Sequence, residues 1–79
     1  MSTKDLRAAV ALLAAGDWQG AHAIVQDDED SRPACWAHAI VHLMEGDAAN
    51  ARYWYRKAGR RFSDDVGAEI AALRASLEA

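Results

Sequence analysis

The sequence predicts an all-α protein built from two antiparallel helical hairpins and a C-terminal capping helix. Apolar residues recur at steps of three and four along nearly the whole chain, which is the helical period. Glycine followed by aspartate separates these stretches at positions 16–17 and 46–47. Glycine ends a helix readily and aspartate caps the start of the next one. No stretch alternates polar and apolar side chains as a half-buried strand does.

The first hairpin is expected at about residues 3–29. Ser2 or Thr3 supplies the cap of its first helix, because a short hydroxyl side chain accepts a bond from the exposed backbone N–H groups there. The second helix follows the Asp17 cap. It is expected to end at the acidic run at 27–30, because carboxylates near a helix C-terminus oppose the helix dipole.

The second hairpin is expected at about residues 32–61. Ser31 precedes a proline in the predicted first turn, the one place where a helix tolerates proline well. Trp36 and Ile40 belong to the apolar face of that helix. The following helix begins at the Asp47 cap.

The capping helix is expected at about residues 64–78, with Ser63 or Asp64 as its cap. Its apolar stripe consists of Val66, Ile70, Leu73 and Leu77. Its polar residues are expected to face outward, as a terminal helix requires; they are Glu69, Arg74, Ser76 and Glu78. The whole chain, 1–79, is then a single helical-repeat domain.

A repeated phrase links the two hairpins. Gly16-Asp17-x-x-x-Ala21 returns as Gly46-Asp47-x-x-x-Ala51, thirty residues later. A period in this range is typical of stacked helical hairpins.

The second copy of this phrase resembles the tetratricopeptide family. Gly46, Ala51, Tyr55 and Ala58 match that family's pattern of glycine, alanine, an aromatic residue and alanine. The chain is also similar to small bacterial proteins of tetratricopeptide-like fold, from which no activity carries over. The resemblance implies a scaffold that binds proteins or peptides in a groove, without catalysis.

Composition excludes several classes of protein. With 52% hydrophobic and 27% charged residues, the chain is not a disordered tail. Its single cysteine excludes an internal disulfide framework. The longest uncharged apolar stretch, residues 8–15, is too short to cross a bilayer. Charged residues at the N-terminus argue against a secretory signal, so a cytoplasmic protein without a membrane partner is expected.

The sequence favours an interaction module over an enzyme. It contains neither a phosphate-binding glycine loop nor a dinucleotide fingerprint. Cys35 and His38 lie one turn apart, but nothing within a single helix orients the imidazole or supplies an oxyanion hole. No catalytic residue is therefore assigned.

A basic stretch in the second hairpin marks the predicted contact surface for a protein or peptide. Arg52, Arg56 and Arg60 are the expected contacts, together with Trp54. The net charge of −3 makes nucleic acid a less favoured partner. Two and a half repeat units leave apolar surface uncovered, so a homodimer is expected.

A second interpretation assigns a metal site. Cys35, His38, His42 and Glu45 recur at steps of three, four and three, which places them on one helical face. Histidines four residues apart can reach one ion, and His22 of the preceding helix is a further candidate ligand. Cysteine, histidine and glutamate together would suit zinc. The alternative is that these small and polar side chains only pack between helices.

Overall fold

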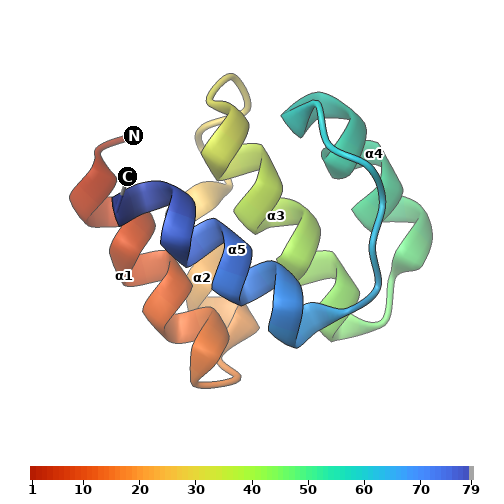
Figure 1. Ribbon diagram of the computed structural model, residues 1–79, viewed down its shortest axis with the longest axis horizontal. Helices are drawn as coiled ribbons and strands as arrows, with labels where there is room; N and C mark the ends of the chain where they lie inside the picture. The colour runs from red at the N-terminus through yellow and green to blue at the C-terminus, as the bar shows by residue number, and fades with distance from the viewer. Residues whose placement is uncertain (79) are drawn as a thin grey trace.

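The computed structural model describes residues 1–78 as an all-helical chain, with no strand in that range (Figure 1). This confirms the predicted all-α class. The five helices are α1 (Thr3–Ala14), α2 (Trp18–Val25), α3 (Arg32–Glu45), α4 (Ala48–Ala58) and α5 (Val66–Glu78).

Helix α3 lies at the centre of the molecule. Every residue from 34 to 42 is buried, and the helix contacts all four of the others. Figure 1 shows it between α4 on one side and α1 and α2 on the other. A helix that is covered on all sides must accommodate any polar side chain within the core. Two histidines of α3 are in that position.

The two glycine–aspartate turns have the structure that the sequence predicts. Gly16 and Gly46 adopt left-handed φ values of 84° and 89°, which only glycine adopts at little cost. Asp17 Oδ1 accepts a bond from the backbone N–H of Gly20 at 2.9 Å, and Asp47 Oδ1 accepts one from Asn50 at 3.1 Å. Each turn therefore ends one helix and caps the next.

Helix α5 begins at Val66, slightly later than expected. Its cap is Asp65, whose Oδ1 accepts a bond from the backbone N–H of Ala68 at 3.1 Å. The Ser63 hydroxyl accepts a bond from the Asp65 N–H at 3.2 Å and so shapes the turn before the helix. The sequence offers several capping residues in a row here, and local preference alone does not choose among them.

Helix α5 packs across α1 and α3 (Figure 1). Ile70 and Leu73 are its buried residues, as the apolar stripe predicts. Helix α5 therefore covers one side of α1 and of α3.

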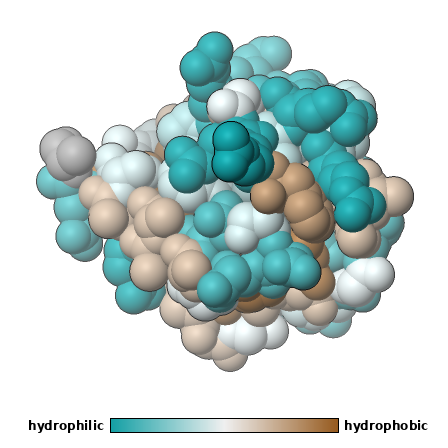
Figure 2. Space-filling model, turned by 45° about the vertical axis from the view of Figure 1, so that its right-hand side comes forward, coloured by the Kyte–Doolittle hydropathy of each residue, from teal (hydrophilic) through white to brown (hydrophobic). Residues whose placement is uncertain are grey.

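The surface on the α4 side is mainly hydrophilic. Figure 2 shows it as clusters of hydrophilic side chains around a short hydrophobic strip. No helix in the described part of the chain is long and apolar enough to cross a membrane.

Candidate functional site

Three histidines meet between α2 and α3. His38 and His42 lie one turn apart on α3, and His22 comes from α2. One ring nitrogen of each lies within 4.8 Å of one nitrogen of each other ring. The ring centroids are 4.9 Å apart for His22–His38, 5.7 Å for His22–His42 and 4.9 Å for His38–His42. We call His22, His38 and His42 the histidine cluster.

The histidine cluster is mostly buried. His38 is 4% exposed and His42 is 7% exposed, while His22 is half-buried. His38 Nδ1 is buried without any hydrogen-bond partner in the described residues. Buried polar atoms are nearly always paired in folded proteins, because an unpaired one loses its bonds to water without replacement. This nitrogen therefore needs an explanation beyond packing.

The pKa of His38 is lowered from 6.5 to about 4, mainly by burial. The neighbouring His42, His22 and Lys57 contribute to this lowering, because each would repel a positive charge on His38. The imidazole of His38 is thus neutral at neutral pH, and a neutral imidazole is the form that binds metal ions.

The indole of Trp54 forms one wall of the histidine cluster. Its ring is stacked on His38 with 3.8 Å between centroids and 9° between planes. Lys57 Nζ lies 5.0 Å from the centroid of the Trp54 ring. Trp54 is only 8% exposed, although the sequence predicts it as a partner contact. Its position leaves little of the indole for a partner.

A carboxylate orients His42. Nδ1 of His42 is 2.6 Å from Oε1 of Glu45, one turn further along α3. This bond occupies Nδ1, so Nε2 is the His42 nitrogen that remains for a ligand. Asp47 lies near the same pair, with ligand atoms of the three residues within 4.8 Å of one another. The predicted helical face thus brings His42 and Glu45 together.

Cys35 does not join the histidine cluster. Its thiol donates to the carbonyl oxygen of Glu29 at 3.4 Å, near the turn before α3. It belongs to neither group of potential metal ligands found in the described residues. The helical rise accounts for the separation, because His42 lies about 10 Å further along the helix axis than Cys35. Burial raises the pKa of the thiol, so a nucleophilic thiolate is disfavoured there.

The basic residues of the second hairpin contact aromatic rings of this same chain. The Arg52 guanidinium lies 4.6 Å from the centroid of Phe62, and that of Arg60 lies 3.5 Å from the centroid of Trp36. Arg56 is exposed on α4. Arg52 and Arg60 are exposed as well, but their guanidinium groups are held by these stacking contacts.

Glu69 corrects an expectation about the capping helix. Its side chain turns inward instead of outward, and Oε1 accepts bonds from Trp36 Nε1 at 3.1 Å and from the Tyr55 hydroxyl at 2.7 Å. Burial and the Glu69 carboxylate raise the pKa of Tyr55, which remains a donor. The sequence holds one signal for this position: Glu69 precedes the buried Leu73 by four residues and so shares its helical face.

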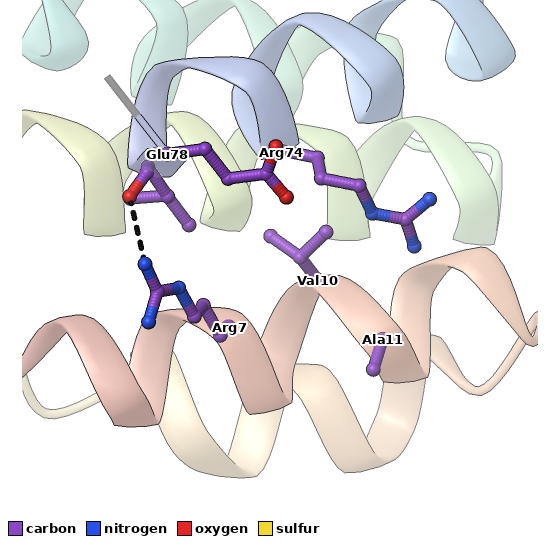
Figure 3. A pocket seen from close by; sticks show the side chains of 6 residues that line it. Arg7, Val10, Ala11, Arg74 and Glu78 are labelled. Atoms are coloured by element: carbon purple, nitrogen blue, oxygen red, sulfur yellow. Dashed lines mark hydrogen bonds between the residues drawn. The ribbon is translucent and has the colours of Figure 1, made fainter.

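A separate hollow lies between α1 and α5 (Figure 3). Its volume is about 190 Å³, and Arg7, Arg74 and Glu78 are among its lining residues. Arg7 donates to the Leu77 carbonyl oxygen at 3.2 Å, while the Arg74 side chain extends away from Arg7. The two cations therefore do not converge on one point.

No family model, curated protein or solved structure matches this chain.

Proposed function

We propose that this protein binds a divalent transition-metal ion, zinc, through His22, His38 and His42. The observation that carries this proposal is the convergence of three imidazoles, one of which, His38, also has a buried nitrogen, Nδ1, without a hydrogen-bond partner in the described residues. Imidazole nitrogens are good zinc ligands, and three histidines form a known type of zinc coordination set.

The spacing of the histidine cluster is compatible with a metal-free site. Ligand nitrogens around a tetrahedral zinc ion lie about 3.3 Å apart, given bonds of about 2.0–2.1 Å. The nitrogens here lie within 4.8 Å of one another, so small ring rotations would bring them to an ion. His22, on the more exposed edge, is best placed to move.

The surroundings of the histidine cluster favour metal binding further. The Glu45 carboxylate at His42 Nδ1 supplies the outer contact that usually fixes a metal-binding histidine and raises its basicity. Three protein ligands leave the fourth zinc position to water or to a ligand from outside the chain. Zinc would also tie α2 to α3, so part of its binding energy would stabilise the fold.

Zinc titration of the chelator-treated protein tests the proposal. We expect one zinc ion per chain by native mass spectrometry, and a changed Trp54 fluorescence because its indole stacks on His38. Zinc at 100 times its dissociation constant should stabilise the fold by about 2.7 kcal/mol.

Matched variants identify the ligands. His22→Gln and His42→Gln should each weaken zinc binding at least 10-fold, whereas Cys35→Ser should leave zinc affinity unchanged. A protein that folds normally but takes up no stoichiometric zinc would overturn the proposal. An equal loss in Cys35→Ser would show that a different set of ligands binds the metal.

The non-catalytic protein-interaction module stays a prediction, as does the homodimer. Four exposed residues define the surface that such a partner would meet. They are Arg52, Arg56, Arg60 and Tyr53, the last of which is 44% exposed. The same native mass spectrum tests the homodimer, because it reports the number of chains together with the bound metal.

A further inference from the structure

A second hollow lies between the first turn of α3 and the end of α4. Its volume is about 280 Å³, and its lining includes Arg32, Trp36, Gly59 and Arg60. Trp36 belongs to the side of α3 that contacts α5 through Glu69, so this hollow is separate from the histidine cluster. None of these residues belongs to the proposed zinc site.

Arg60 is held in place over an anchored ring. Its guanidinium carbon lies 3.5 Å from the centroid of Trp36, which is 5% exposed. The indole cannot turn freely, because its Nε1 donates to Glu69 at 3.1 Å. Stacking uses the flat face of a guanidinium and leaves its N–H edges able to donate hydrogen bonds. The side-chain entropy of Arg60 is thus already reduced before any ligand arrives.

Arg32 approaches the same place across Gly59. Gly59 ends α4 with a left-handed φ of 71°, and a Cβ atom there would lie 3.5 Å from the Arg32 guanidinium carbon. The Arg32 side chain therefore rests against the backbone immediately before Arg60. Both residues line one hollow, which therefore has two positively charged side chains at its border.

Neither guanidinium is neutralised within the described chain. Among residues 1–78, no carboxylate oxygen lies within 4.0 Å of a nitrogen of Arg32 or Arg60. Oε1 of Glu69 already accepts two hydrogen bonds, from Trp36 and from Tyr55. Arg32 is also the first residue of α3, where the helix dipole adds partial positive charge.

We infer that this hollow binds an oxyanion, a phosphate or carboxylate group, between the guanidinium groups of Arg32 and Arg60. Arginine pairs with both groups through two parallel N–H···O bonds, and the anion would relieve the repulsion between two neighbouring cations. Stacking on Trp36 gives Arg60 the fixed orientation that such paired bonds require.

The test is isothermal titration of the chelator-treated protein with inorganic pyrophosphate and, separately, with citrate. Metal-free protein is needed because both probes also bind zinc. We expect at least one probe to bind at low ionic strength and to weaken as sodium chloride is added. The stronger probe identifies the source of the oxyanion, a phosphate or a carboxylate compound.

Charge-matched variants locate the site. Arg32→Gln and Arg60→Gln should each weaken the stronger probe at least 10-fold, whereas Arg56→Gln, an equal charge change on exposed α4, should weaken it less than 2-fold. Arg60→Lys keeps the charge and loses the paired bonds, so it should also weaken binding clearly. Failure of both probes to bind would overturn the inference. Equal weakening by all the arginine variants would also overturn it, because binding would then reflect diffuse charge.

Discussion

Two clusters of polar side chains include residues of α3, and they differ in whether their polar atoms have hydrogen-bond partners. In the first, Trp36, Tyr55 and Glu69 satisfy one another, since both donors reach the same carboxylate oxygen. In the second, His38 keeps a buried nitrogen without a partner. A satisfied cluster stabilises and orients the helices that supply it, whereas an unsatisfied one costs stability unless a ligand completes it. The difference is consistent with a structural role for Glu69 and supports the proposed zinc-binding role of the histidines.

The largest effect is expected from removing the centre of the satisfied cluster. Glu69→Ala leaves the Trp36 and Tyr55 donors without their acceptor, which should lower the free energy of unfolding by about 3 kcal/mol. Urea unfolding measures this loss. Glu78→Ala, an exposed position on the same helix, should change it by less than about 0.5 kcal/mol. Equal effects of the two variants would remove the distinction between the clusters.

The unsatisfied cluster should respond to pH when zinc is absent. The pKa of His38 is about 4 in the folded protein, below the ordinary histidine value of 6.5, so the unfolded chain binds the proton first as pH falls. The stability of the fold is then fully present above pH 6.5 and decreases toward pH 4, by on the order of 2–3 kcal/mol. His42, His22 and Lys57 contribute to the lowered pKa of His38, because their positive charge would repel a protonated imidazole.

Urea unfolding of chelator-treated protein between pH 4 and 7.5 measures this dependence. His38→Leu should flatten the part of the profile between pH 6.5 and 4, and it should cost little stability at pH 7 because it removes an unpaired polar atom. An unchanged profile in His38→Leu would contradict the assignment to this residue.

Glu45, the carboxylate at the histidine cluster, should affect zinc affinity, whereas Glu69 should affect the stability of the fold. Glu45→Gln should weaken zinc binding about 10-fold, because the carboxylate orients His42 from outside the coordination set. The stability of the zinc-free protein should change little, since Glu45 lies near the surface with a side chain 28% exposed. Competition with a chelating dye measures the affinity, and Glu78→Gln is the control. A loss of stability without a loss of zinc affinity would make Glu45 a structural residue only.

The smallest effect is expected for Tyr55→Phe. This change removes one donor and keeps the ring that packs against Phe62 with 5.7 Å between centroids. Glu69 retains its bond from Trp36, so the free energy of unfolding should fall by about 1 kcal/mol. Thermal unfolding monitored by circular dichroism measures this loss of stability. A loss as large as that of Glu69→Ala would show that the hydroxyl, not the carboxylate, is the centre of the cluster.

The sequence by itself determined the helices and most of their ends. The start of α5 is the exception, because Asp65 caps it in place of Ser63 or Asp64. The features that determine the helices and their other ends depend only on four or five neighbouring residues. They are the helical periodicity, the caps at Ser2, Asp17 and Asp47, and the glycines at 16 and 46. Local chemistry of this kind can be interpreted without knowing what packs against it. The face shared by His38 and His42 follows from the same short-range geometry.

Only the tertiary structure decided which residues meet across helices. It brought His22 to His38 and left Cys35 at the other end of the face, because ligand distance depends on how α2 lies against α3. It turned Glu69 inward, since α5 packs across α1 and α3 and brings that carboxylate to Trp36. Each such contact depends on helix packing between distant segments. No spacing within one helix specifies that packing.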